Sequence, residues 1–140
     1  MKKGLVGIDT NILVHALIVQ DEAKHEAAKR LLRDIVEHGD RYILSYQVIG
    51  ELYSTMLRIA PSLMEEAIAL ARLLARRLRL IHYTASELEN ATRTSTPKRF
   101  WDTVLALTYR RHGATLILAE NTQDFRGLIQ AMNPFTGEEA

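Results

Sequence analysis

Asp9 is the first residue along the chain whose type and position could support chemistry, and it directly follows the short apolar segment LVGI at residues 5–8. Such a segment is too short for a helix and is typical of a buried strand in a parallel sheet. An aspartate at the carboxyl end of such a strand lies where open α/β sheets bind ligands. We therefore predict that other polar groups, distant in sequence, converge on Asp9 to hold a divalent metal ion. The alternative is that residues 9–11 only turn the chain and cap the next helix.

Three further polar residues occupy similar places near strand ends and helix starts: Glu51, Asp102 and Asn121. Asp102 is the most informative, because the residues one helical turn further on are apolar or aromatic, and a carboxylate on such a face is unfavourable unless it is paired or binds metal. Glu51 could instead be a solvated side chain with Arg58 nearby. Asn121 could be a helix N-cap, with Asp124 completing the capping pattern.

Oxygen donors without histidine or cysteine favour Mg²⁺ or Mn²⁺ over zinc. Clustered carboxylates repel one another at neutral pH, so they need a cation between them. Such a cation lowers the pKa of a bound water and can stabilise negative charge that develops on a substrate. The chain has no cysteine, which excludes thiolate catalysis and disulfides and fits a reducing cytosol, so we expect a cytoplasmic protein.

The composition is that of a soluble globular protein, with 140 residues, 47% hydrophobic and 25% charged. We expect a single domain over residues 1–140, large enough to bury a substantial core. No apolar run approaches the length of a membrane span, and we find no signal-peptide pattern, so we expect no membrane association. The formal net charge of +1 means that any nucleic-acid binding depends on a local basic patch.

Strand and helix patterns alternate along the chain. Strands are predicted at residues 5–8, 42–45, 78–83 and 115–119, with a final strand that includes Met132. Helices are predicted after Asp9, after Asp21, after Ser45, after Pro61, after Thr84 and after Pro97. Short βα units of this kind predict a three-layer α/β/α sandwich with a mainly parallel central sheet of four to five strands. The helix at residues 62–77 has a wide apolar arc, which indicates either deep burial or a homodimer face.

Four segments carry a resemblance to a known family: residues 7–13 (GIDTNIL), 45–52 (SYQVIGEL), 101–106 (WDTVLA) and 118–125 (LAENTQDF). In this order they resemble the four motifs of PIN-domain proteins, and the chain length resembles that of the VapC toxin ribonucleases of VapBC toxin–antitoxin modules. The resemblance implies a Mg²⁺- or Mn²⁺-dependent endoribonuclease with RNA as its substrate. It also implies a cognate antitoxin protein as a partner.

The resemblance implies that Asp9, Glu51 and Asp102 are the acidic catalytic residues. We assign Asp9 and Asp102 as the principal metal ligands, and Glu51 as a ligand that acts directly or through water. The fourth acidic position of the family aligns with Asn121, which we expect to bind the phosphate or a water, and Ala119 stands where many relatives have Thr or Ser. Hydrogen bonds that orient these groups are expected from Thr10, Asn11 and Asp124.

RNA must approach these carboxylates through cationic side chains. The candidates are Lys98, Arg99, Arg110, Arg111 and Arg126. Each of them could equally be a solvated helix charge. Phe100 and Trp101 are expected to pack in the core rather than stack on bases. A catalytically weak PIN domain that serves as an RNA- or protein-binding scaffold is the alternative function, and the departures at Asn121 and Ala119 keep it open.

Overall fold

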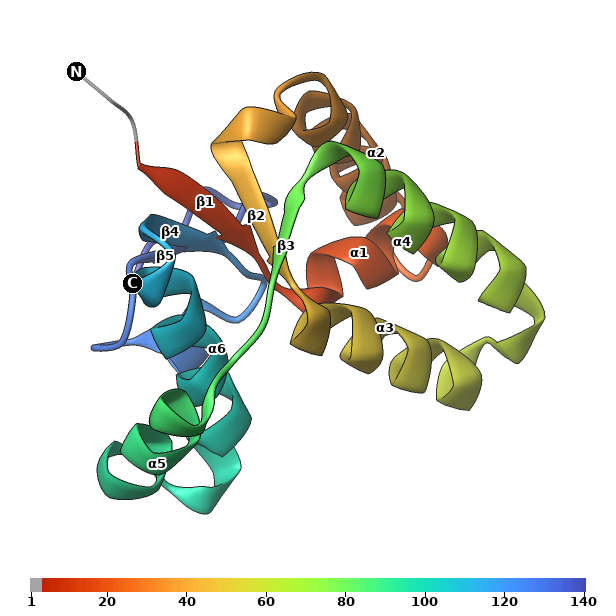
Figure 1. The fold of residues 1–140 in the computed structure, drawn as a ribbon. Coiled ribbons are helices and arrows are strands. Elements are labelled where there is room, and N and C mark those ends of the chain that lie inside the picture. Colours follow the sequence, from red (N-terminus) through yellow and green to blue (C-terminus); the bar gives the residue numbers. More distant parts are fainter. Residues whose placement is uncertain (1–3) are drawn as a thin grey trace.

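The computed structural model describes residues 4–140, in which five parallel strands alternate with six α-helices (Figure 1). The strands are β1 (Leu5–Ile8), β2 (Tyr42–Ser45), β3 (Arg79–Ile81), β4 (Ala114–Leu118) and β5 (Ala131–Met132). The helices are α1 (Thr10–Leu17), α2 (Glu22–Glu37), α3 (Tyr46–Ile59), α4 (Met64–Arg77), α5 (Ala85–Thr94) and α6 (Phe100–Arg111). The predicted α/β sandwich with a parallel sheet is confirmed.

The strand order β3-β2-β1-β4-β5 decides where a ligand can bind. The chain builds outward from β1 through β2 to β3 and then returns to build β4 and β5 on the other side. Because such crossovers are right-handed, the two halves put their helices on opposite faces of the sheet, α1 to α4 on one and α5 and α6 on the other (Figure 1). The order reverses between β1 and β4, and the carboxyl ends of strands at such a reversal form a ligand-binding crevice.

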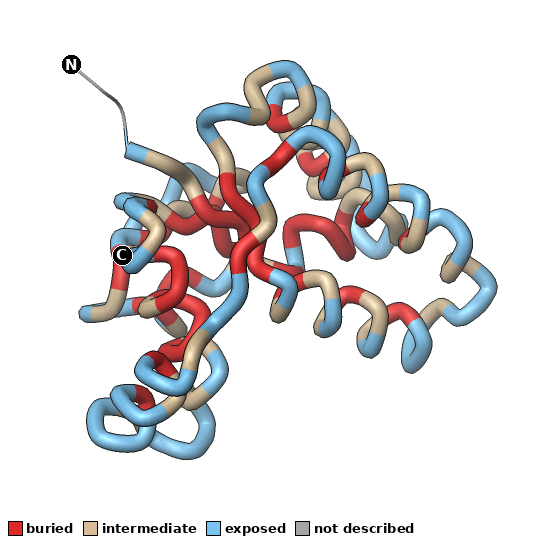
Figure 2. The backbone as a smooth tube through the Cα atoms, in the orientation of Figure 1, coloured by how far each residue is buried: buried red, intermediate tan, exposed pale blue. Residues whose placement is uncertain are grey.

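Tyr109 on α6 locks the centre of the sheet. Its side chain is fully buried. The buried parts of the backbone lie mainly along the central strands and on the turns of the helices beside them (Figure 2). The Tyr109 hydroxyl donates a hydrogen bond to the Ile8 carbonyl (2.6 Å) and accepts one from the Ser45 amide (3.3 Å). It therefore joins the carboxyl ends of β1 and β2 immediately before Asp9 and α3. Gly7 makes this packing possible, since a Cβ there would lie 2.5 Å from the Tyr109 ring.

Two of the predicted N-cap residues form side-chain caps, and the two predicted proline starts need correction. The Asp21 side chain accepts a hydrogen bond from the Lys24 amide, and the Ser45 side chain accepts one from the Gln47 amide (both 3.1 Å). The sequence predicted that Pro61 and Pro97 each open an α-helix, and this is wrong. Each begins a short 3-10 helix, η2 (Pro61–Leu63) and η3 (Pro97–Arg99), and the α-helix follows it.

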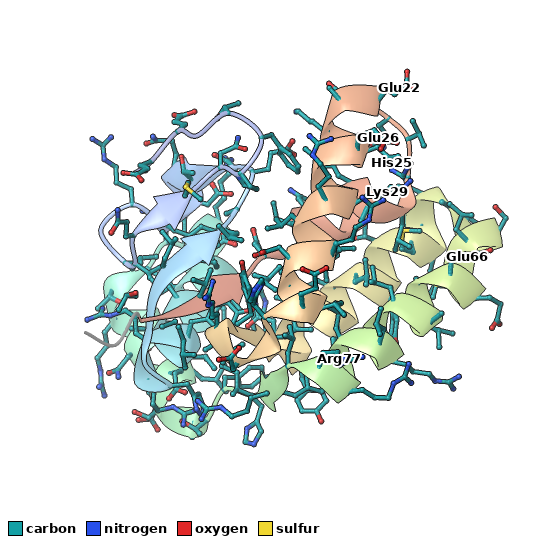
Figure 3. All side chains as sticks on the ribbon, turned by 90° about the horizontal axis from the view of Figure 1, so that it is seen from above. Glu22, His25, Glu26, Lys29, Glu66 and Arg77 are labelled. Atoms are coloured by element: carbon teal, nitrogen blue, oxygen red, sulfur yellow. The ribbon has the colours of Figure 1, made fainter. Side chains whose placement is uncertain are left out.

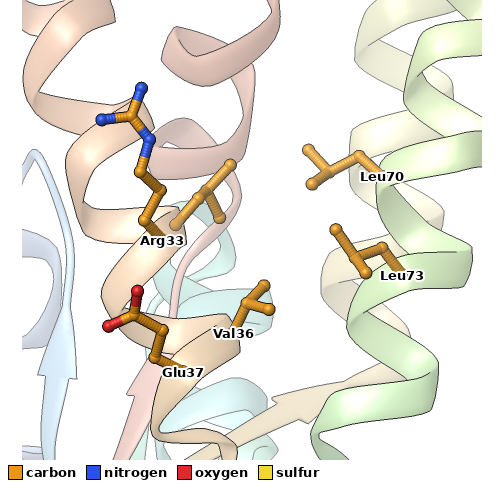
Figure 4. Close-up of a pocket in the computed structure, with 6 residues that line it drawn as sticks. Arg33, Val36, Glu37, Leu70 and Leu73 are labelled. Carbon is orange, nitrogen blue, oxygen red and sulfur yellow. The ribbon is translucent and has the colours of Figure 1, made fainter.

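The wide apolar arc of α4 serves two surfaces. Ala67, Ala71 and Leu74 are buried in the core. Leu70 and Leu73 are half-buried and, with Leu32 and Val36 of α2, line an apolar groove edged by Arg33 and Glu37 (Figure 4). A homodimer through α4 stays a prediction.

The outer surface of α2 carries charged side chains, among them Glu22, Glu26 and Lys29 (Figure 3). Lys29 and Glu26 form a long ion pair of 3.8 Å. No helix within residues 4–140 combines the length and apolar character needed to cross a membrane.

We expect Gly7→Ala to destabilise the fold by about 1–3 kcal/mol, because the added methyl group overpacks the Tyr109 ring. Denaturant unfolding measures the change. The same substitution at Gly50 in α3 is the control, since a Cβ there meets nothing within 4 Å. Gly50→Ala should stabilise the helix by about 0.5–1 kcal/mol. Equal stability of the two variants would contradict the role assigned to Gly7.

Candidate active site

Four acidic residues meet at the carboxyl edge of the sheet. Asp9 follows β1, Glu51 lies in α3, Asp102 lies in the first turn of α6, and Asp124 lies in the short helix η4 (Thr122–Phe125) after β4. Burial raises the pKa of Asp9 to about 7; the Thr10 backbone amide opposes the rise, and the charges of Glu51, Asp102 and Asp124 add to it. Asp9 is therefore a carboxyl group surrounded by other carboxylates in a poorly hydrated position.

Asp102 shares this environment. Burial, together with the charges of Asp124 and Glu51, raises its pKa to about 6, and the positive charge of Arg99 opposes this rise. Glu51 and Asp102 thus lie close enough to Asp9 for their charges to raise its pKa, and the role of the three residues as metal ligands stays a prediction. Asp124 joins them as a fourth acidic group.

The position of Asp9 does not fit a simple capping role. Asp9 occupies the N-cap position of α1, yet its carboxylate makes no side-chain capping hydrogen bond. By contrast, Asp21 and Ser45 cap their helices with side-chain oxygens. The carboxylate of Asp9 is therefore available for other partners.

Glu51 is fixed by two hydrogen bonds on its two oxygens. The Thr10 hydroxyl donates to Oε2 and the Gln47 amide nitrogen donates to Oε1, both at 2.9 Å. This arrangement differs from a solvated side chain beside Arg58. It also differs from the expectation that Thr10 orients Asp9, because the hydroxyl reaches across to α3 instead. Sequence reasoning missed Gln47, although its i, i+4 spacing to Glu51 is a usable signal.

Asn121 and Asp124 differ in their relation to the other acidic groups. Asn121 is exposed and stands at the start of η4 without a side-chain capping bond, so the predicted cap does not form. Asp124 is half-buried and acts on both Asp9 and Asp102. Arg99 anchors this turn by donating to the backbone carbonyls of Asp124 (2.7 Å) and Arg126 (3.1 Å). Asn11 is exposed, and its role stays a prediction.

A family model for the PIN domain matches residues 6–128. The chain belongs to the PIN domain family. No curated protein sequence matches it.

Solved structures show the same fold. VapC20 of Mycobacterium tuberculosis, described as a sarcin–ricin loop cleaving toxin, is 23% identical with a TM-score of 0.68 over 89% of this chain and 96% of that one. A chain of VapBC2 from Rickettsia felis, bound to a promoter DNA fragment, is 16% identical with a TM-score of 0.61 over 92% and 99%. A chain of DNA-bound VapBC from Salmonella typhimurium is 18% identical with a TM-score of 0.58 over 93% and 98%.

A further carboxylate of this PIN domain, that of Glu120, is paired with basic side chains and is not one of the four acidic groups described above. Glu120 precedes Asn121, but it accepts hydrogen bonds from Lys24 (2.8 Å) and pairs with His15 (2.9 Å). Burial alone would raise the pKa of Glu120, and these two partners hold it below its ordinary value. Sequence reasoning found no role for His15, because the pairing joins α1 to the end of β4.

The predicted RNA-binding cations are distributed unevenly. Arg99 lies beside Asp102, and Lys98 is exposed next to it. Arg110 and Arg111 lie at the other end of α6, away from Asp102, and Arg111 is paired with Glu87 at 2.6 Å. Arg126 contacts the side chain of Gln123. Of the five candidates, Arg99 is the one whose charge acts on an acidic residue of the site.

The donor set is chemically suited to a divalent cation. Four carboxylates supply only oxygen atoms, and two of them have raised pKa values because burial and mutual repulsion disfavour their charge. As placed, no three acidic or histidine side chains within residues 4–140 are grouped closely enough to hold a metal ion. Binding of a cation would therefore require the four carboxylates to rotate toward a common centre.

We expect Asp9→Asn to raise the melting temperature at pH 8 in EDTA. The pKa of Asp9 is about 7 in the folded state, against an ordinary value of 3.8 for an aspartate in water, so the folded protein binds this proton more tightly than the unfolded chain. The contribution of Asp9 to the free energy of unfolding is therefore fully present below pH 4 and is lost as the pH rises through 7. The difference between variant and wild type should vanish near pH 4, where both side chains are neutral.

Differential scanning fluorimetry from pH 4 to 8 measures this dependence. Asp40→Asn is the control, because Asp40 is exposed in the turn before β2, at the opposite edge of the sheet. An Asp9→Asn variant that melts below wild type at pH 8 would contradict the crowding of charge at Asp9.

Proposed function

We propose that this PIN domain protein is a metal-dependent endoribonuclease that hydrolyses RNA phosphodiester bonds at Asp9, Glu51, Asp102 and Asp124. The observation that carries the proposal is the shared environment of Asp9 and Asp102, whose pKa values are both raised by burial and by the same neighbouring carboxylates. Strongly perturbed carboxyl groups at a topological switch point are typical of catalytic sites.

Asp9 and Asp102 would hold Mg²⁺ or Mn²⁺, with Glu51 and Asp124 completing the oxygen ligands directly or through water. When bound, the cation neutralises the carboxylates and stabilises the negative charge that develops on the phosphate. This assignment transfers the fourth acidic role from Asn121 to Asp124. Asn121, with its exposed amide, would donate a hydrogen bond to the RNA phosphate.

The residues of the chain itself would position the reacting groups. Glu51, whose two oxygens are fixed by Thr10 and Gln47, would orient the attacking water and accept its proton. Arg99 lies close enough to Asp102 to oppose the rise in its pKa, so its guanidinium could also attract the phosphate of an incoming strand.

The structural relatives support a more specific proposal. VapC20 is described as a sarcin–ricin loop cleaving toxin, and the other two are VapBC complexes. We propose that this protein is the toxin of such a pair, with a cognate antitoxin and with RNA as its substrate. Its homodimerisation is a further proposal, which sedimentation velocity over a range of protein concentrations tests.

We expect wild type to cleave RNA with Mg²⁺ or Mn²⁺ and to lose cleavage in EDTA. Asp9→Asn and Asp102→Asn should each lower the rate by about 100-fold or more, because each removes charge from the site that binds the cation. A panel of structured and unstructured RNAs, resolved on denaturing gels, provides the measurement, with Asp40→Asn as the control. Cleavage that survives in both variants would refute the site.

Wild type that binds RNA but cuts none of the panel with either metal would favour the scaffold function. Isothermal titration with Mn²⁺ separates the two functions, because a scaffold has no need of a cation at Asp9. Wild type should bind Mn²⁺ and Asp9→Asn should not.

We expect Asp124→Asn to reduce cleavage by about 100-fold, and Asn121→Ala to reduce it by less than about 10-fold. The reason is that Asp124 acts electrostatically on Asp9 and Asp102, whereas loss of the Asn121 amide removes one neutral hydrogen bond. Single-turnover rates on the best RNA of the panel decide between them. A larger loss of cleavage in Asn121→Ala than in Asp124→Asn would assign the fourth site position to Asn121 instead.

A further inference from the structure

An aromatic groove opens beside Glu51 on the outer side of the carboxylates. Its lining residues are Gln47, Gly50, Glu51, Ser54, Tyr83 and Trp101. Helix α3 supplies one wall, and the segment after β3 together with the start of α6 supplies the other. Glu51 belongs both to this groove and to the proposed catalytic site, so the two are continuous.

The aromatic wall is open to solvent. Trp101 is 50% exposed and Tyr83 is 37% exposed. Their ring centroids lie 5.8 Å apart with the planes tilted by 53°, and Phe100 packs edge-on against the indole. The expectation that Trp101 packs in the core is therefore wrong, because the first turn of α6 carries its side chain away from the sheet. An indole of this exposure offers a flat apolar surface next to a proposed nuclease site.

Trp101 is tied to the proposed catalytic residues. The Gln47 amide nitrogen donates to both the Glu51 carboxylate and the Trp101 carbonyl, each at 2.9 Å. The next residue after Trp101 is Asp102. A ligand stacked on the indole would therefore lie close to Glu51 and Asp102, two of the four carboxylates.

Gly50 is the unexpected residue of this groove. It lies inside α3, in an ordinary helical conformation, where glycine is less favourable than alanine. A Cβ at this position would meet nothing within 4 Å, so no contact inside the protein calls for glycine. Its absent side chain keeps the α3 wall flat and low opposite the two aromatic rings.

We propose that this groove binds one unpaired base of the RNA, stacked on Trp101, beside the phosphate that is cleaved. The proposal rests on the proposed nuclease function and adds a subsite, formed by residues of this chain, that recognises one base of the RNA. A base fits this slot because every base has a flat π-face that stacks on aromatic side chains. A base within a duplex is already stacked on both sides and cannot enter.

Trp101 is the single tryptophan of the chain, so its fluorescence reports on the groove directly. The test uses the Asp9→Asn protein in EDTA at low salt, where the RNA stays intact. We expect 12-mers of oligo(A), oligo(U) and oligo(C) to quench the fluorescence, and a 12-base-pair RNA duplex to leave it unchanged. Absence of quenching by all three single strands, or equal quenching by the duplex, would overturn the proposal.

Substitutions at Gly50 test the groove without altering the aromatic wall. In the same Asp9→Asn protein, Gly50→Met should abolish quenching and weaken binding of a fluorescein-labelled oligo(A) 12-mer by about 5- to 150-fold, the contribution expected of one stacked base. Ala75→Met adds the same side chain at an exposed position of α4 and should change neither quantity. Trp101→Ala should weaken binding as Gly50→Met does, and Trp101→Phe should restore most of it. Unchanged binding in both Gly50→Met and Trp101→Ala would overturn the proposal.

These measurements are independent of catalysis. Quenching by single strands in a protein whose wild type cleaves no RNA would mean that the nuclease proposal fails and the base site stands. Metal-dependent cleavage by wild type, without quenching and without an effect of Gly50→Met, would mean that the nuclease stands and the base site fails.

Discussion

Crowding of negative charge at one edge of the sheet is the constraint on which the rest of this structure depends. Asp9 and Asp102 lie in poorly hydrated positions among other carboxylates, so their charged forms are disfavoured. Acidic residues elsewhere are handled differently, since Glu120 is paired with Lys24 and Glu87 with Arg111. At Asp9 and Asp102, by contrast, the neighbouring charges are mostly of the same sign. Such an arrangement lowers stability at neutral pH, and we propose that it gives the site affinity for a cation.

The fold keeps these residues together through α6, which serves two purposes. Its first turn carries Asp102, and two turns later its Tyr109 hydroxyl joins the ends of β1 and β2. Because Gly7 lets the Tyr109 ring lie directly on β1, the strand that ends at Asp9 has little freedom to shift. The same helix thus supplies one acidic residue and fixes the strand before another. A loose arrangement of the four carboxylates would bind a cation weakly.

The hydrogen bonds of Gln47 connect two features that would otherwise be separate. One partner is the Glu51 carboxylate, which we propose takes part in the chemistry, and the other is the backbone carbonyl of Trp101 in the aromatic groove. Recognition of a base and orientation of Glu51 would then depend on one side chain. Gly50, between Gln47 and Glu51, gives up helix stability to keep the groove open. Stability is commonly lower at functional sites for this reason.

The sequence by itself determined the strand–helix alternation and the parallel sheet, because apolar periodicity and polar residues at strand ends are local signals. It also proposed Asp9, Glu51 and Asp102 as site residues, through their places near strand ends and helix starts and through the resemblance of four segments to PIN-domain motifs. Only the tertiary structure decided that Asp124 joins these three residues, that Glu120 is paired with His15 and Lys24, and that Trp101 faces solvent. Each of these facts depends on how segments far apart in the chain meet around the β1–β4 switch point. No local pattern encodes that meeting, since it is set by strand order and by the packing of Tyr109 on Gly7.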